Sequence, residues 1–122
     1  MTKCLDVVLD TNVVYSALRS QLGASHRLMQ LVAERSHFQI HLSVPLVLEY
    51  EEVAKRSARS LGLAHEDIDN VIDFLCSIGE RHSIHYLWRP YLPDQHDDML
   101  LELAVTANCS HIITYNIRDF IG

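Results

Sequence analysis

The sequence predicts an α/β fold, a three-layer α/β/α sandwich around a mostly parallel sheet of four to five strands. Short apolar runs alternate with longer amphipathic stretches along the chain. Such alternation is typical of parallel strands joined by helical crossovers. The centre of the first run, Val7-Val8-Leu9, is continuously apolar and mostly β-branched. That composition favours a strand buried on both faces of a parallel sheet.

The other elements follow from periodicity and from the residues that begin and end helices. Apolar and polar residues alternate at 38–42, which indicates a half-buried strand, and Ser43 and Pro45 then mark a helix start. The clearest helix has apolar residues at core spacing and ends at Gly79. In chain order we expect a first strand that ends before Asp10, helices at 13–19 and 25–35, a strand at 38–42, helices at 46–59 and 65–78, a strand at 83–87, a loop at 90–96, a helix at 97–107 and a strand at 111–115.

Length and composition limit the classes of protein to which this chain can belong. The 122 residues, 48% of them hydrophobic, are expected to form one domain, 1–122. The formal net charge of −6 argues against binding nucleic acid by bulk electrostatics and leaves only local contact. No apolar run is long enough to cross a bilayer, so we expect no membrane association and a cytoplasmic location. The three widely spaced cysteines are expected to be buried free thiols.

Polar and acidic residues follow each predicted strand. In a parallel sheet the carboxyl ends of the strands meet at one edge, which is where open α/β sheets bind ligands. Asp10 and Thr11 could instead simply cap the next helix, and the other acids at this edge are what favour a binding site. In strand order, the residues are Asp10 and Asn12, then Glu49 about one turn into the next helix, then Asp97 and Asp98 across a loop, and finally Asn116 and Asp119.

Helix geometry separates some of these candidates. On the predicted 97–107 helix, Asp97 leans toward the apolar stripe and Asp98 points away from it. Asp97 is therefore the better ligand, and Asp98 is a surface or supporting acid. Glu49 and Glu51 flank the stripe of their helix on opposite sides, so periodicity does not choose between them.

Converging carboxylates repel one another unless a cation neutralises them. A site built only from oxygen ligands suits Mg²⁺ or Mn²⁺. Such ions support attack by water on a phosphodiester. The four glycines are isolated, so the sequence contains no P-loop and no dinucleotide-binding fingerprint.

Four motifs carry a resemblance to a known family. They are Val-Leu-Asp-Thr-Asn at 8–12, Ser-Val-Pro-Leu-Val-Leu-Glu-Tyr at 43–50, Asp-Asp-Met-Leu-Leu-Glu-Leu-Ala at 97–104 and Ile-Ile-Thr-Tyr-Asn-Ile-Arg-Asp-Phe at 112–120. In this order and spacing, the chain resembles the PIN-domain family of metal-dependent ribonucleases. That family includes the VapC toxins of bacterial toxin–antitoxin pairs.

The resemblance implies an endoribonuclease that uses Mg²⁺ or Mn²⁺. It matches Asp10, Glu49, Asp97 and Asp119 to the acidic quartet of the family, and so favours Glu49 over Glu51. Asp98, in place of Asp97, matches the third acid of the family if the alignment of the two sequences places one loop residue differently. Thr11, Asn12, Thr114 and Asn116 would be supporting polar groups. The resemblance also implies a cognate antitoxin, an RNA substrate and a homodimer or higher oligomer.

Other residues are weaker candidates for function. Lys55, Arg56 and Arg59 form a basic cluster that could contact RNA phosphates. Neither His37 with His41 nor His82 with His85 is placed to chelate zinc, because both pairs lie on or beside predicted strands. Two rival functions are a catalytically inactive RNA-binding domain with the same fold and a phosphatase with Asp10 as nucleophile. The phosphatase normally needs a lysine late in the sheet, and neither Lys3 nor Lys55 is placed for that role.

Overall fold

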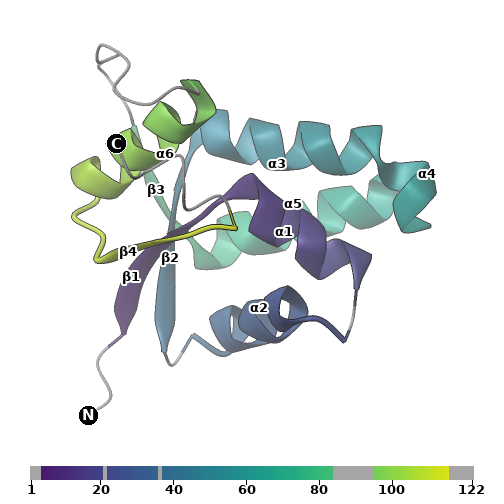
Figure 1. Ribbon diagram of the computed structural model, residues 1–122, viewed down its shortest axis with the longest axis horizontal. Helices are drawn as coiled ribbons and strands as arrows, with labels where there is room; N and C mark the ends of the chain where they lie inside the picture. Colours follow the sequence, from purple (N-terminus) through teal and green to yellow (C-terminus); the bar gives the residue numbers. More distant parts are fainter. Residues whose placement is uncertain (1–3, 21, 36, 84–94, 116–122) are drawn as a thin grey trace.

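The protein is an α/β fold with a four-stranded parallel sheet, as predicted. The computed structural model describes residues 4–20, 22–35, 37–83 and 95–115, with the backbone alone at 95–98 (Figure 1). The strand order is β3-β2-β1-β4. In chain order the elements are β1 (Leu5–Leu9), α1 (Thr11–Arg19), α2 (Ala24–Glu34), β2 (Phe38–Ser43), α3 (Val44–Arg56), α4 (Ala58–Leu61), α5 (His65–Ile78), β3 (Glu80–His82), α6 (Gln95–Thr106) and β4 (His111–Ile113).

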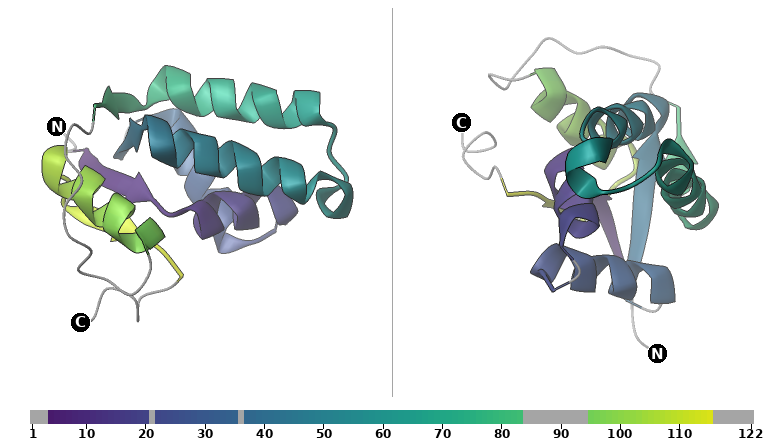
Figure 2. Two further views of the ribbon diagram at one scale, coloured as in Figure 1. Left: turned by 90° about the horizontal axis from the view of Figure 1, so that it is seen from above. Right: turned by 90° about the vertical axis from the view of Figure 1, so that its right-hand side faces the viewer.

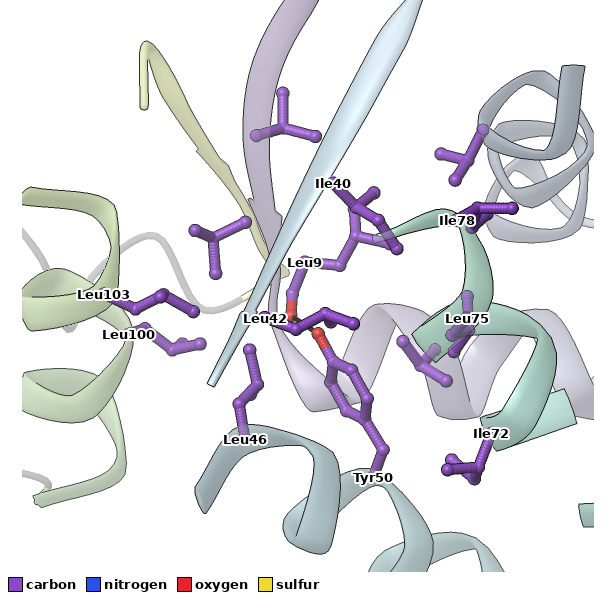
Figure 3. Close-up of a cluster of buried hydrophobic side chains, with 14 of the residues drawn as sticks. Leu9, Ile40, Leu42, Leu46, Tyr50, Ile72, Leu75, Ile78, Leu100 and Leu103 are labelled. Atoms are coloured by element: carbon purple, nitrogen blue, oxygen red, sulfur yellow. Dashed lines mark hydrogen bonds between the residues drawn. The ribbon is translucent and has the colours of Figure 1, made fainter. Parts of the chain in front are cut away.

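Helices cover both faces of the sheet. Helix α6 packs on β1, β2 and β4, and α5 contacts β2 from the other side (Figure 2). Helix α3 contacts β2 and packs against both α5 and α6. Figure 3 shows Leu100 and Leu103 of α6 on one side of the strands and Leu75 and Ile78 of α5 on the other. The centre of β1 is buried throughout, with Val8 fully inaccessible. This double burial is the environment that the continuous apolar run predicted.

The start of α3 is set by its cap. The Ser43 side chain accepts a hydrogen bond from the Leu46 backbone N–H at 3.4 Å, and Pro45 occupies the first turn. The predicted helix at 46–59 is divided, because the backbone at Ser57 leaves the helical conformation and α4 follows as a separate turn. Gly62 ends α4 in the left-handed region, with φ of 70°.

The third strand was predicted in the wrong place. The structure has β3 at Glu80–His82, whereas the sequence indicated 83–87; Ser83 is not in a strand, and 84–87 lie outside the described residues. The segment Glu-Arg-His has no apolar pattern. It is extended because it pairs in parallel with β2, with His41 opposite Glu80 and Ser43 opposite His82.

Two smaller expectations also need correction. Helix α6 begins at Gln95, inside the predicted loop. All three cysteines are free, as expected, but Cys4 is exposed whereas Cys76 and Cys109 are half-buried. Burial, followed by the charges of Asp6 and Glu80, raises the pKa of the Cys109 thiol to about 11. None of the helices within the described ranges is long and apolar enough to cross a membrane.

Gly79 joins α5 to β3 where no side chain fits. A Cβ added there would lie 2.5 Å from Leu42 Cδ1 and 3.0 Å from the Leu75 carbonyl oxygen. Gly79→Ala is therefore expected to lower the free energy of unfolding by about 1–3 kcal/mol, because the buried Leu42 has to move. Urea unfolding measures the change. Gly23→Ala is the control, since its new Cβ would meet nothing closer than 3.6 Å. Equal effects of the two substitutions would contradict this account.

Candidate active site

Asp10 lies at the carboxyl end of β1, where the chain turns into α1. Its backbone N–H donates to the Ile113 carbonyl at 2.9 Å, and its own carbonyl accepts from Val13 at 3.0 Å. The residue is only 1% exposed. It occupies the N-cap position of α1, but its side chain makes no capping hydrogen bond. The interpretation that Asp10 is there to cap the helix with its carboxylate is therefore wrong.

The Asp10 carboxylate is instead held by Thr114. The register pairs Leu9 with Ile113, so Thr114 follows β4 at the level of Asp10. The Thr114 hydroxyl donates to Asp10 Oδ2 at 2.5 Å. One residue further on, the backbone N–H of Tyr115 points to Asn12 Oδ1 at 3.5 Å. The end of β4 thus orients polar side chains at the junction of β1 and α1.

Tyr50 connects α3 to the same junction. Its hydroxyl donates to the Leu9 carbonyl, the last of β1, and the residue is buried (Figure 3). Burial, followed by the negative charges of Asp10 and Glu49, raises the pKa of Tyr50 well above its usual value. The negative charges of both carboxylates therefore disfavour the ionised form of the Tyr50 hydroxyl. Glu51, the alternative that periodicity left open, lies 3.4 Å from Lys55 Nζ.

Thr11 contributes a buried hydroxyl to this junction. The residue is 6% exposed, and within the described part of the chain its Oγ1 has no hydrogen-bond partner. Buried hydroxyls are normally hydrogen-bonded, and Thr11 Oγ1 is hidden from solvent. The side chains of Asp10, Glu49 and Thr11 offer only oxygen atoms as metal ligands. Such a set fits a hard divalent cation such as Mg²⁺ or Mn²⁺.

Several predicted site residues lie where the structure describes no side chain. Asp97 and Asp98 are in the first turn of α6, and nothing is described of their side chains. Asn116 and Asp119 lie outside the described residues. Of the predicted quartet, the structure therefore describes the side chains of Asp10 and Glu49.

The basic cluster lies at the far end of α3 and on α4. Glu49 and Arg56 are seven residues apart on one helix, which corresponds to about 10 Å along its axis. Lys55 Nζ lies 2.7 Å from Asp69 Oδ1 on α5, and this hydrogen bond raises the pKa of Lys55. Arg56 lies 3.7 Å from Glu52, and Arg59 is exposed. A role for these three residues toward RNA stays a prediction.

The sequence reasoning did not single out two residues near this edge. One is Tyr50, for which the available signal was its position beside Glu49. Glu102 on α6 is half-buried, with Oε1 hidden from solvent. It lies one helical turn after Asp98, a spacing that puts both residues on one side of the helix.

A family model described as PIN domain matches residues 6–118. The chain belongs to the PIN-domain family. The resemblance drawn from the four motifs is thereby confirmed, and proteins with PIN domains are generally nucleases. No curated protein sequence matches this PIN domain.

A solved structure shares the fold of this PIN domain. It is described as VapBC2 from Rickettsia felis bound to a DNA fragment from their promoter. The TM-score is 0.63 and the sequence identity is 16%, over 95% of this chain and 91% of that chain. At this identity the likeness shows a common fold, and the residues at the edge of the sheet carry the argument about function.

Tyr50→Phe tests the hydroxyl that joins α3 to β1 in this PIN domain. Losing it leaves the buried Leu9 carbonyl without this donor, so the free energy of unfolding is expected to fall by about 1–3 kcal/mol at neutral pH. Because the pKa of Tyr50 is raised in the folded protein, the contribution of Tyr50 to stability also depends on pH. An unfolded tyrosine ionises near pH 10, so the stability supplied by Tyr50 is present below about pH 10 and is lost as the pH rises through its folded value.

Urea unfolding between about pH 8 and pH 11 measures both effects. Tyr50→Phe is expected to lose stability less steeply above about pH 10 than the unsubstituted protein. Tyr115→Phe is the control, because Tyr115 is exposed and its hydrogen bond to Ser25 lowers its pKa. A Tyr50→Phe protein as stable as the unsubstituted one at neutral pH would show that this hydrogen bond contributes nothing.

Proposed function

We propose that this PIN domain is a cytoplasmic endoribonuclease that uses Mg²⁺ or Mn²⁺ to hydrolyse RNA phosphodiester bonds. The observation that carries the proposal is the buried Asp10 carboxylate at the carboxyl end of β1, oriented by Thr114. Glu49, whose negative charge together with that of Asp10 raises the pKa of Tyr50, is the second proposed ligand. Family membership supports the reaction class. Asp97 and Asp119 complete the proposed quartet of acidic ligands.

Electrostatics explain why a cation belongs at this position. Taking a carboxylate out of water is costly, and a second carboxylate nearby adds repulsion. Asp10 is 1% exposed, and Glu49 acts on the same Tyr50 hydroxyl. A divalent ion between these acids offsets both costs. The fixed geometry of Asp10 means that little reorganisation is needed when the ion binds.

Each residue has a role in the proposed reaction. Asp10 and Glu49 hold the ion from β1 and α3, and Thr114 keeps the Asp10 carboxylate in one orientation. Thr11 and Asn12 offer side-chain oxygens at the start of α1, and Asp98 and Asn116 are proposed to support the outer ligands. When bound, the ion activates water for in-line attack and stabilises the charge that develops on the phosphate. Lys55, Arg56 and Arg59 are proposed to contact the RNA backbone.

Asp10→Asn tests the nuclease directly. The substitution keeps the shape of the side chain but removes its charge, so RNA cleavage with added Mn²⁺ is expected to fall by about 100-fold or more. Glu49→Gln is expected to act in the same direction. Glu51→Gln is the matched control, because Glu51 lies on the same helix and pairs with Lys55. Cleavage of a labelled RNA over time, with and without EDTA, is the measurement.

The possible outcomes separate the rival functions. Equal cleavage by the Asp10→Asn and unsubstituted proteins would overturn the proposal. Absence of both cleavage and Mg²⁺ or Mn²⁺ binding in the unsubstituted protein would favour an inactive RNA-binding domain. A phosphoryl group trapped on Asp10 would favour the phosphatase.

We further propose that the chain is the toxin of a toxin–antitoxin pair, held inactive by a cognate antitoxin protein and assembling as a homodimer or higher oligomer. The shared fold with the toxin–antitoxin structure from Rickettsia felis supports this proposal. A ribonuclease toxin that is not held by an antitoxin would degrade transcripts and stop growth, so the proposal requires an inhibitory binding partner.

The toxin proposal predicts an effect on growth. Induced expression of the chain in a bacterial host is expected to arrest growth, because free enzyme cleaves cellular RNA. Asp10→Asn is expected to relieve the arrest, and Glu51→Gln is expected to leave it in place at equal protein level. Optical density after induction and an immunoblot for protein amount provide the measurements. Normal growth with the unsubstituted chain present and folded would contradict the proposal.

A further inference from the structure

A second group of possible metal ligands lies on β2 and β3. It consists of His41 on β2 and of Glu80 and His82 on β3, whose ligand atoms all lie within 4.8 Å of one another. His41 is 4% exposed at its side chain, His82 is 19% exposed and Glu80 is 61% exposed. None of these residues belongs to the proposed nuclease quartet.

The parallel register brings the three side chains together. His41 is opposite Glu80, and His82 is opposite Ser43, so all three side chains leave the same face of the sheet. The two imidazole rings are stacked, with centroids 5.0 Å apart. His41 Nδ1 and His82 Nε2 lie 2.8 Å apart. A Glu80 oxygen lies 3.9 Å from the first nitrogen, and the other oxygen lies 4.0 Å from the second.

These separations are close to those of a tetrahedral zinc site. With metal–nitrogen distances of about 2.0 Å, tetrahedral geometry places neighbouring ligand atoms about 3.3 Å apart. The two nitrogens would need to separate by about half an ångström to reach that value. The exposed Glu80 carboxylate would need to turn inward by a similar amount. Both changes are within the range of small side-chain rotations.

Asp6 on β1 supplies an independent indication of a metal site. Its Oδ1 lies 2.9 Å from His41 Nε2. An ionised carboxylate only accepts hydrogen bonds, so His41 carries its proton on Nε2 and presents the lone pair of Nδ1 to the cluster. Metal-binding histidines characteristically donate their other ring N–H to a carboxylate in this way, which fixes the tautomer and the ring orientation.

We propose that His41 Nδ1, His82 Nε2 and the Glu80 carboxylate bind one Zn²⁺ ion, with Asp6 as a positioning residue. Two imidazoles and one carboxylate form a borderline ligand set that suits zinc, in contrast to the oxygen-only set at Asp10. A fourth position is left for water. Without the ion, His82 donates a hydrogen bond from its Nε2 to His41 Nδ1. When zinc binds to Nε2 of His82, the proton of His82 resides on its own Nδ1. The ion links β2 to the short strand β3.

Calorimetric titration of Zn²⁺ tests the proposal on protein freed of its purification tag and of bound metal. One ion is expected to bind per chain. His82→Gln and Glu80→Gln are each expected to weaken binding by about tenfold or more, because each removes a ligand. His37→Gln is the matched control, because His37 is exposed and precedes β2, the strand that carries His41. Repeating the titrations in an Asp10→Asn background separates this site from the carboxylate site.

Any one of three results would overturn the proposal. The first is equal zinc affinity in the His82→Gln and unsubstituted proteins, and the second is no zinc binding by the folded unsubstituted protein. The third is zinc binding that is lost in Asp10→Asn but retained in His82→Gln. Circular dichroism without metal checks that each variant is folded. If His82→Gln does not fold, Glu80→Gln decides the outcome, since its side chain is largely exposed.

Cobalt provides a readout of geometry. Co²⁺ at this site is expected to show the intense visible bands of tetrahedral coordination, and His82→Gln is expected to lose them. Asp6→Asn is expected to keep the bands while lowering affinity by about 10–100-fold, because it removes the orienting carboxylate and leaves the three ligands in place. Only weak bands, as in octahedral Co²⁺, would overturn the proposed ligand set. The result is independent of ribonuclease activity.

Discussion

The parallel pairing of β1 with its two neighbours determines where the polar groups of this protein lie. Strand β1 pairs with β2 on one side and with β4 on the other. The same register that places Ile113 beside Leu9 carries Thr114 to Asp10. A shift by one residue would turn the side chains of a strand to the opposite face. The continuous burial of Val7, Val8 and Leu9 between two layers of helices holds the position of β1.

A second constraint acts through Tyr50. Helix α3 carries Glu49, and the next residue inserts its ring into the core and bonds to the last carbonyl of β1. Glu49 is therefore attached to the strand that carries Asp10 by a buried hydrogen bond as well as by packing. The two carboxylates come from residues far apart in the chain, and the negative charges of both raise the pKa of a single tyrosine.

Much of this arrangement could be predicted from sequence because its signals are local. The apolar run before Asp10, the cap formed by Ser43 and Pro45 and the periodicity of α5 each depend on neighbouring residues. They define strand ends and helix starts, and thereby the edge of the sheet where Asp10 lies. Glu49 and Glu51 could not be separated in this way. Their difference depends on Lys55 and Asp69, and thus on how α3 packs against α5.

Strand β3 and the histidine cluster could not be predicted, because both depend on pairing between distant segments. Glu80–His82 has no apolar pattern, and it is a strand because β2 lies beside it. His41 and His82 are separated by 41 positions in the chain. By their spacing in the sequence, His41 is grouped with His37 and His82 with His85. Only the register between β2 and β3 shows that the rings of His41 and His82 lie together.

The short strand β3 also affects how copies of this chain can associate. Among the residues that the structure describes, β3 is the edge of the sheet next to β2 and has three residues, of which Glu80 and Arg81 are exposed. Short, charged edge strands discourage the addition of a strand from another molecule. On this side the sheet is poorly suited to extension from one subunit to the next. An assembly of this protein that uses this side would therefore rely on helical surfaces and not on pairing through β3.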